Sequence, residues 1–272
     1  MAVVTGAASG IGQAISVRLA QDFLVVNVDV NEEGLRATAE VIAHNGGSVN
    51  SLTGDVSQRS THESARTLAE SQGNLVAWVN CAGWTRGAAL HDFPEDSRVF
   101  EELIGANQHG TFWGCAEAVN YFVTNQIKGS IVNISSVHGR RAWRDHAVYE
   151  MTKAAVDALT RNVAVTYGPY GIRCNAVAPG AVMTPALEKS IVEAPNPASR
   201  KKTLEDLTPL RRIAEPSEIA EVVAFLLSEK SSYVSGQSIA VEGAWTSALG
   251  VIDLDPDLAK RYGFDSHDGS RL

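Results

Sequence analysis

Short apolar segments rich in β-branched residues recur along the chain and predict strands. They lie at Ala2–Thr5, Leu24–Val28, Val49–Leu52, Leu75–Val79, Ser130–Ile134, Arg173–Val177 and Ser238–Val241. Between them, apolar residues recur at helical spacing and predict helices at 11–20, 31–44, 57–72, 96–126, 147–167 and 215–228. This alternation is typical of an α/β fold: a doubly wound parallel sheet of about seven strands, with helices on both faces and right-handed crossovers.

One folded unit accounts for the whole pattern. No internal repeat, low-complexity tract or linker divides the sequence, so we expect a single domain over residues 1–272. Two segments depart from the alternation. Residues 185–212 carry four prolines and are interpreted as a lid-like segment over a substrate, and residues 247–272 are interpreted as a C-terminal extension.

Charge and cysteine content argue against several classes of function. Lys and Arg number 23 against 31 Asp and Glu, a net charge of −8, which gives no reason to expect nucleic acid or an anionic membrane as a partner. The three cysteines lie far apart and show no spacing typical of a metal site. The sequence has no recognisable signal peptide and no apolar run of ~18 residues that could cross a membrane. We therefore expect a cytoplasmic protein without a bound metal.

The most informative chemical signal is the pair Tyr149 and Lys153 in the predicted helix 147–167. Their spacing is about one helical turn, which places both side chains on one face. A tyrosine hydroxyl has an ordinary pKa of roughly 10, and a nearby ammonium is expected to lower that pKa. Ser136, thirteen residues before Tyr149, can hold the oxygen of an alcohol or carbonyl. Such a set suits proton transfer between an alcohol and a ketone, which also needs a hydride carrier.

A site for such a carrier is predicted at the start of the chain. The first strand is followed by Gly6-Ala7-Ala8-Ser9-Gly10-Ile11-Gly12 and then by the predicted helix 11–20. Strand, glycine turn and helix are typical of a dinucleotide site, because glycine lets the backbone approach a pyrophosphate at a helix N-terminus. The spacing is Gly-x3-Gly-x-Gly, not Gly-x-Gly-x-x-Gly, so the turn alone is a weak signal.

Six motifs in a fixed order make the chain resemble the short-chain dehydrogenase/reductase family from residue 2 to about residue 246. They are Thr5-Gly6-x3-Gly10-x-Gly12, Asp55-Val56, Asn80-Cys81-Ala82-Gly83, Asn107, the Ser136/Tyr149/Lys153 set and Pro179-Gly180-x3-Thr184. The sequence departs from the family at two positions: Cys81 replaces an asparagine, and Ala244 follows Glu242-Gly243 where the family has Asp-Gly-Gly.

This resemblance implies a Rossmann-type fold and a catalytic tetrad of Asn107, Ser136, Tyr149 and Lys153. In the family, the asparagine helps hold a water that connects the lysine to solvent. The implied cofactor-binding residues are Gly6, Ser9, Gly10, Ile11, Gly12, Asp29, Asp55, Val56, Asn80, Ala82, Gly83, Tyr149, Lys153, Pro179, Gly180, Val182 and Thr184. The family commonly pairs the helices that match 96–126 and 147–167, which implies a homotetramer.

Asp29 predicts that the cofactor is NAD. It ends the second strand, seventeen residues after Gly12, where an acid can accept hydrogen bonds from the adenosine ribose and repel a 2′-phosphate. The next residues, Val30 and Asn31, offer no cation to a phosphate. The alternative interpretation is that Asp29 caps the predicted helix 31–44.

The segment between Ser136 and Tyr149 is unusually basic and predicts a polar substrate. It contains His138, His146 and three arginines in a protein that is acidic overall. Because arginine suits carboxylates and phosphates, we expect an anionic substrate. The predicted substrate-binding residues are Ser136, His138, Arg144, Tyr149, Trp84 and Arg86. Alternatively, the arginines pair with acids or face water.

The resulting hypothesis is an enzyme, an NAD-dependent short-chain alcohol dehydrogenase. It would interconvert a secondary alcohol and a ketone on a small polar substrate such as a sugar acid or related hydroxy acid. Two alternatives stay open. One is a 3-oxoacyl thioester reductase, and the other is a non-catalytic dinucleotide-binding protein, which would have no use for a complete proton relay.

Overall fold

A single parallel sheet organises the computed structural model, which describes residues 1–93, 98–250 and 255–263. Within these residues the strands are β1 (Ala2–Thr5), β2 (Val25–Asp29), β3 (Val49–Thr53), β4 (Ala77–Asn80), β5 (Ser130–Ile134), β6 (Arg173–Pro179) and β7 (Ser238–Val241). Their order in the sheet is β3-β2-β1-β4-β5-β6-β7. The order reverses between β1 and β4, where open α/β sheets bind ligands. The predicted doubly wound α/β fold is confirmed.

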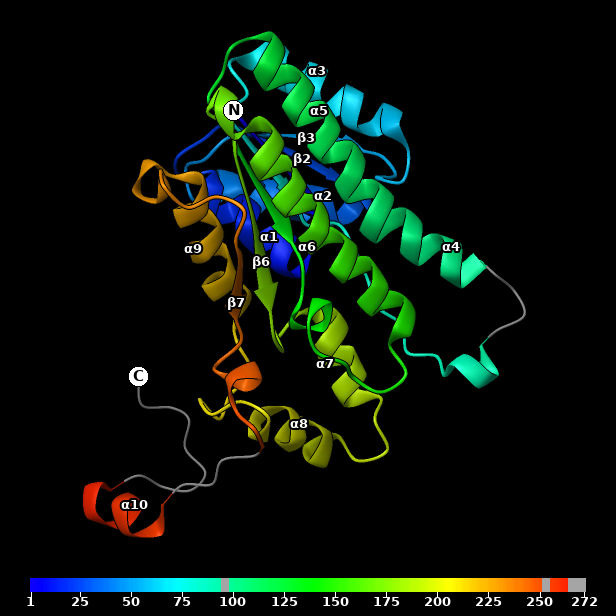
Figure 1. Cartoon of the computed structure of the whole chain (residues 1–272), viewed down its shortest axis with the longest axis vertical. Helices are drawn as coiled ribbons and strands as arrows, with labels where there is room; N and C mark the ends of the chain where they lie inside the picture. The colour runs from blue at the N-terminus through cyan, green and yellow to red at the C-terminus, as the bar shows by residue number, and fades with distance from the viewer. Residues whose placement is uncertain (94–97, 251–254, 264–272) are drawn as a thin grey trace.

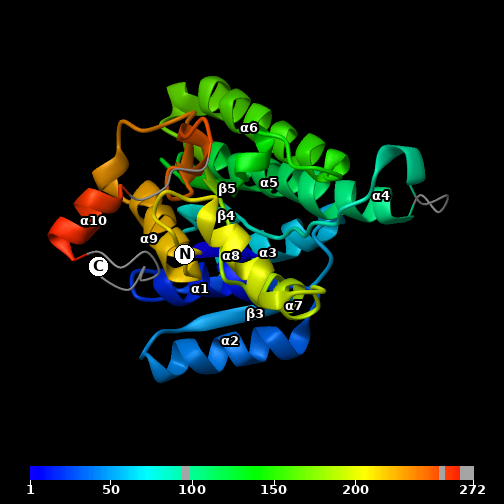
Figure 2. The same ribbon diagram turned by 90° about the horizontal axis from the view of Figure 1, so that it is seen from below.

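Helices cover both faces of the sheet (Figure 2). One face carries α1 (Gly10–Leu19), α2 (Glu32–His44) and α9 (Pro216–Leu227). The other carries α3 (Arg59–Gln72), α5 (Gly110–Thr124) and α6 (Ala147–Tyr167). Strands covered in this way have no polar face, which is why β1 buries all four of its residues and β5 all five.

The predicted helix 96–126 is divided into three parts. It consists of α4 (Arg98–Ile104), a turn of π-helix at Gly105–His109, and α5. Residues 96 and 97 lie outside the described part of the chain. The π turn coincides with the predicted catalytic Asn107, and such turns often occur at functional sites.

The proline-rich segment 185–212 forms two short helices beyond the carboxyl end of β6 (Figure 1), α7 (Pro185–Val192) and α8 (Pro197–Asp206). Each begins with proline directly after a capping side chain, Thr184 for α7 and Asn196 for α8. A small apolar cluster of its own, built around Ile191, Leu204 and Ile213, holds the segment together. Its lid function stays a prediction.

The C-terminal extension is described in part. Residues 247–250 and 255–263 have described positions, the latter including α10 (Pro256–Tyr262), whereas 251–254 and 264–272 lie outside the described residues. Among the described residues, no helix is both long and apolar enough to cross a membrane. In the same residues, no group of three or more side chains suited to metal binding comes together.

Candidate active site

Three of the predicted catalytic side chains meet at the carboxyl end of β5. Ser136 follows this strand, whereas Tyr149 and Lys153 lie about one turn apart on α6. Ser136 lies close enough to the Tyr149 phenol to counteract, by hydrogen bonding, part of the rise in its pKa. Lys153 Nζ lies 5.6 Å from the centre of the Tyr149 ring and donates a hydrogen bond to the Ile134 carbonyl at 2.8 Å. The structure thus brings a phenol, an amine and a second hydroxyl into one site.

Burial controls the protonation of this group. Burial raises the pKa of the Tyr149 phenol, the Ser136 hydrogen bond opposes that rise, and Cys81 adds to it. Burial also lowers the pKa of Lys153 to about 8, against the opposing effects of Cys81 and Asp157. The sequence predicted a lowered pKa for Tyr149. That prediction is wrong for the net direction, because removing a phenolate from water outweighs the Ser136 hydrogen bond that favours it.

Asn107 joins the segment after β4 to the catalytic helix. It is fully buried in the π turn, and its Oδ1 accepts a hydrogen bond from the Trp84 backbone N–H at 2.9 Å. Its Nδ2 donates to the Trp84 carbonyl at 3.0 Å and to Thr152 Oγ1 on α6 at 3.1 Å. A Cβ on Gly83 would lie 2.7 Å from Asn107 Oδ1, so this glycine is needed for the close approach.

The glycine turn meets the end of β4 at very short range. Gly6 has a φ of +71°, which side chains disfavour, and a Cβ there would lie 2.7 Å from Ala82 Cα. Thr5 Oγ1 accepts hydrogen bonds from the backbone N–H groups of Cys81 and Ala82, at 3.1 and 3.2 Å. These contacts fix the two strand ends on either side of the crevice that the fold predicts for a dinucleotide.

The start of α1 is suited to an anion. Ser9 precedes the helix, is exposed and makes no capping hydrogen bond with its side chain. Ile11 packs against the core from the first turn, and Gly12 is buried where a Cβ would collide with the Gly6 carbonyl. The first backbone N–H groups of the helix therefore remain close to a surface without side chains, a cradle that fits a pyrophosphate.

The segment after β6 closes against this turn. Pro179 ends the strand, and Val182 is buried. A Cβ on Gly180 would lie 2.9 Å from the Glu242 Cβ, so the absence of a side chain allows this close approach. A Cβ on Gly10 would lie 3.1 Å from Thr184 Cγ2. Thr184 Oγ1 accepts the capping hydrogen bond of α7, which leaves its O–H available as a donor.

Asp29 is bonded to the glycine turn, which the sequence did not predict. One carboxylate oxygen accepts a hydrogen bond from the Ala8 backbone N–H at 3.1 Å, and the other from that of Asn31 at 3.0 Å. The cap of α2 is Asn31, whose Oδ1 accepts from Gly34 N–H at 3.1 Å. The alternative interpretation of Asp29 as the helix cap is therefore wrong.

Three other predicted cofactor residues have side chains that already contact other parts of the protein. Asp55 is exposed and its Oδ1 accepts a hydrogen bond from the backbone N–H two residues on, whereas Val56 is buried in the core. The side chain of Asn80 points into the core, where it accepts from Trp78 Nε1 and donates to Asn133 Oδ1, both at 2.9 Å. Only the backbone of Asn80 is left to contact a ligand.

Of the predicted substrate-binding residues, His138 lies closest to the catalytic group. Its backbone N–H donates to Ser136 Oγ at 3.2 Å, and its ring stands edge-on to Tyr149, with centroids 5.6 Å apart. Trp84 and Arg86 lie in the segment after β4, and both are exposed. The structure therefore joins His138 to the catalytic residues directly and Trp84 through Asn107.

Two arginines of the basic segment lie beside acidic side chains. The Arg144 side chain is 91% exposed, and its Nε lies 3.3 Å from Asp145 Oδ2. Arg140 Nε lies 3.4 Å from the buried carboxylate of Asp157 on α6. The structure does not bring Arg144 beside Ser136 or Tyr149, and it gives Arg140 an acidic partner.

Sequence reasoning missed Glu150, the residue after Tyr149. Its Oε1 accepts a hydrogen bond from the Trp143 backbone N–H and lies 3.4 Å from His138 Nδ1. The available signal was an acid in the first turn of the catalytic helix, after a loop with two histidines.

Comparisons with known proteins identify the family of this chain. Residues 6–246 match the profile of the family described as Enoyl-(Acyl carrier protein) reductase. The chain belongs to the short-chain dehydrogenase/reductase family, and it is therefore an oxidoreductase enzyme of the class that acts on alcohols and ketones and binds a nicotinamide dinucleotide.

Three relatives illustrate the range of this family. Glucose 1-dehydrogenase 2 of Bacillus subtilis is 34% identical, over 90% of this chain and 94% of its own length. Human (3R)-3-hydroxyacyl-CoA dehydrogenase is 35% identical, over 89% and 94% respectively. The structure of a putative 2-deoxy-d-gluconate 3-dehydrogenase from Agrobacterium tumefaciens with bound NADP is 28% identical, with a TM-score of 0.80 over 91% of this chain and 96% of that one.

Proposed function

We propose that this enzyme is an NAD-dependent dehydrogenase of a small polar, anionic hydroxy compound such as a sugar acid. The observation that carries the proposal is the contact of Ser136, Tyr149 and Lys153 at the end of β5. In alcohol oxidation Tyr149 removes the hydroxyl proton, and in ketone reduction it donates one. Ser136 donates a hydrogen bond to the reacting oxygen as charge develops there. The dinucleotide supplies the acceptor or donor of the hydride.

Lys153 and Asn107 support this proton transfer. The ammonium of Lys153 stabilises the phenolate of Tyr149 and, by the family resemblance, also binds the nicotinamide ribose. Asn107 keeps the segment after β4 in contact with α6 through its bonds to Trp84 and Thr152. In this proposal Asn107 also helps hold the water that links Lys153 to solvent, as the family resemblance implies.

The choice of NAD rests on Asp29. The cradle of Gly6, Gly10 and Gly12 takes the pyrophosphate, and the Asp29 carboxylate accepts from the ribose hydroxyls. A 2′-phosphate would face this carboxylate, with the apolar Val30, 67% exposed, beside it. The Agrobacterium relative has bound NADP, so the choice of NAD rests on the residues of this chain and not on that likeness. The remaining cofactor contacts are proposed for Ser9, Ile11, Asp55, Val56, Asn80, Ala82, Gly83, Pro179, Gly180, Val182 and Thr184.

The substrate is proposed to lie between Tyr149 and the mouth formed by His138, Trp84 and Arg86. An anionic group would bind Arg86 and Arg144. Arg144 reaches such a group only by turning away from Asp145. A sugar-type substrate is in keeping with the glucose and deoxygluconate dehydrogenases among the relatives.

Reduction of a 3-oxoacyl thioester is the second candidate. The human relative named for hydroxyacyl-CoA and the family description both favour it. The polar wall around His138 and the acid at Asp29 favour the first candidate. A purely dinucleotide-binding role is the third, and the complete proton-transfer set argues against it.

The proposal extends to assembly and location. We place the enzyme in the cytoplasm as a homotetramer, with the exposed faces of α5 and α6 as a subunit contact, as the family resemblance implies. The segment 185–212 would close over the substrate as a lid.

The test is NADH formation from a panel of sugar acids, polyols and 3-hydroxyacyl thioesters. We expect the highest kcat/KM on a sugar acid or related hydroxy acid. The Tyr149→Phe variant keeps the ring and removes the proton carrier, so its turnover should fall by ~10²–10⁴ while NAD binding is retained. A Tyr149→Phe variant with wild-type turnover would show that another group is the base. A thioester as best substrate would favour the second candidate.

A further inference from the structure

A carboxylate beside the catalytic tyrosine faces a histidine of the substrate mouth. Glu150 lies in the first turn of α6, and its Oε1 accepts a hydrogen bond from the Trp143 backbone N–H. The same oxygen lies 3.4 Å from His138 Nδ1. Both side chains are largely covered, with 22% of Glu150 and 17% of His138 exposed. Glu150 therefore joins α6 to two points of the preceding loop.

This contact determines which nitrogen of His138 carries the proton. Nδ1 is buried and makes no hydrogen bond of good geometry with any described residue, so the Glu150 oxygen is the polar group that it faces. A neutral imidazole has one N–H and one lone pair. A lone pair facing a carboxylate would be repelled, which places the proton on Nδ1 and the lone pair on Nε2. Burial and His146 lower the pKa of His138, while Glu150 opposes this, and the neutral ring is favoured.

The other side of the ring lies next to the reacting groups. The His138 side chain is 17% exposed, and Nδ1 does not contribute to this exposed surface because it is buried. The ring stands at 69° to the ring of Tyr149, and the His138 backbone N–H is bonded to Ser136 Oγ. The His138 ring therefore borders the Ser136/Tyr149 pair, with its buried Nδ1 turned to Glu150.

We infer that Glu150 is a positioning residue that holds His138 with Nε2 as an acceptor, and that this nitrogen selects substrates with a hydroxyl next to the reacting carbinol. The inference rests on the proposed dehydrogenase function and specifies its substrate as a vicinal hydroxy alcohol. An Nε2 lone pair binds an O–H donor, whereas an ether oxygen at the same position offers no proton. The 3.4 Å contact shortens to a hydrogen bond once the substrate is bound, as catalytic contacts commonly do.

Alcohols that differ only in the group next to the reacting carbinol test whether His138 selects a neighbouring hydroxyl. Cyclohexane-1,2-diol, its monomethyl ether and cyclohexanol are compared by kcat/KM for NADH formation, each as defined stereoisomers. The wild-type enzyme should prefer the diol to the ether about tenfold, the effect of one hydrogen bond. His138→Phe keeps a ring against Tyr149 and removes both nitrogens, so the diol-to-ether ratio should approach one. Comparing this ratio between variants cancels the intrinsic reactivity of each alcohol.

Two further variants separate positioning from general disturbance. Glu150→Gln keeps the side-chain volume and an acceptor for Trp143 but removes the charge that fixes the proton on Nδ1, so the ratio should fall several-fold. Glu221→Gln makes the same change at an exposed glutamate of α9 that pairs with Arg18, and should leave the ratio unchanged. Equal ratios in the wild type and His138→Phe would overturn the inference, as would a wild-type ratio in Glu150→Gln.

The tautomer itself is measurable without turnover. In protein labelled with ¹⁵N-histidine, the His138 signals, assigned by their loss in His138→Phe, should report a protonated Nδ1 and a bare Nε2. Glu150→Gln should shift them toward a mixture. A protonated Nε2 in the wild type would overturn the inference. If no alcohol of any panel yields NADH while Nδ1 is protonated, the dehydrogenase proposal fails and the positioning of His138 by Glu150 stands.

Discussion

At the scale of single residues, burial shifts the pKa values of Tyr149 and Lys153 in opposite directions. The phenol has a raised pKa and holds its proton more firmly, whereas the amine has a pKa lowered to about 8 and releases its proton more easily. Both shifts favour the neutral form, as burial requires. The enzyme at neutral pH is thus set to donate a proton from Tyr149 while Lys153 is still mostly charged.

These directions predict the pH dependence of both reactions. The kcat/KM for ketone reduction should be constant through neutral pH and fall above about pH 8, where Lys153 loses the charge that stabilises the phenolate. The kcat/KM for alcohol oxidation should rise with pH, because the basic form of Tyr149 exists only toward its raised pKa. Initial rates in both directions across pH measure this. In Lys153→Met the fall near pH 8 should vanish, and oxidation that is independent of pH would contradict the prediction.

At the scale of elements, the strands were predictable because the sequence repeats one simple pattern. Runs such as Ser130–Ile134 are apolar and β-branched, and helices on both faces bury every residue of that strand. The break in the predicted helix 96–126 was not predictable from periodicity. Asn107 keeps its π turn through bonds to Trp84 and Thr152, which belong to other elements.

The candidate site was predictable where spacing along one element determines geometry, as for Tyr149 and Lys153 on α6. The site was not predictable where the conformation of a loop determines the direction of a side chain. The basic segment indicated an anion site, but Arg144 turns to Asp145 and Arg140 to the buried Asp157. A motif also does not say which way a side chain points: the Asn80 side chain lies in the core, which leaves the Asn80 backbone for the proposed cofactor contact.

The prediction for cofactor choice concerns Asp29, the last residue of β2, and Val30, which follows it. Because the Asp29 carboxylate also holds the Ala8 N–H, Asp29→Ala should weaken both cofactors, whereas Asp29→Asn keeps an acceptor and removes only the charge. Asp29→Asn combined with Val30→Arg should shift the NADP-to-NAD ratio of kcat/KM by about ten- to a hundredfold toward NADP, from one charge-assisted contact. Equal use of both cofactors by the wild type would show that Asp29 does not select.

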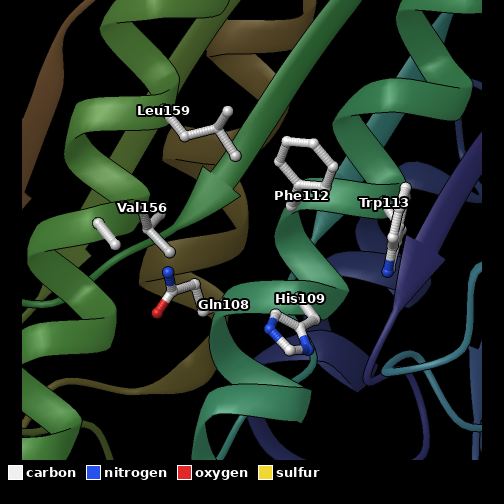
Figure 3. A pocket seen from close by; sticks show the side chains of 7 residues that line it. Gln108, His109, Phe112, Trp113, Val156 and Leu159 are labelled. Atoms are coloured by element: carbon white, nitrogen blue, oxygen red, sulfur yellow. The ribbon is translucent and has the colours of Figure 1, made fainter.

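At the scale of the whole molecule, an apolar cleft between α5 and α6 is the feature that best suits a second subunit. It has a volume of about 360 Å³, and residues from the π turn, α5 and α6 line it (Figure 3): Gln108, His109, Phe112, Trp113, Ala155, Val156 and Leu159. Phe112 is 48% exposed at its edge, and Met151 on α6 is 57% exposed. Contiguous apolar surface of this kind commonly marks a contact between proteins.

The proposed homotetramer therefore predicts a specific effect of charge on this face. Phe112→Glu places a carboxylate in a contact that repeats in each copy, so two like charges and the loss of an aromatic side chain should weaken association by at least tenfold in Kd. Val41→Glu adds the same charge on α2, at a side chain that is 44% exposed, and should leave association unchanged. Sedimentation or light scattering over a range of concentrations measures both variants. If Phe112→Glu keeps the wild-type assembly, subunits meet through another face, and a monomeric wild type would exclude the tetramer altogether.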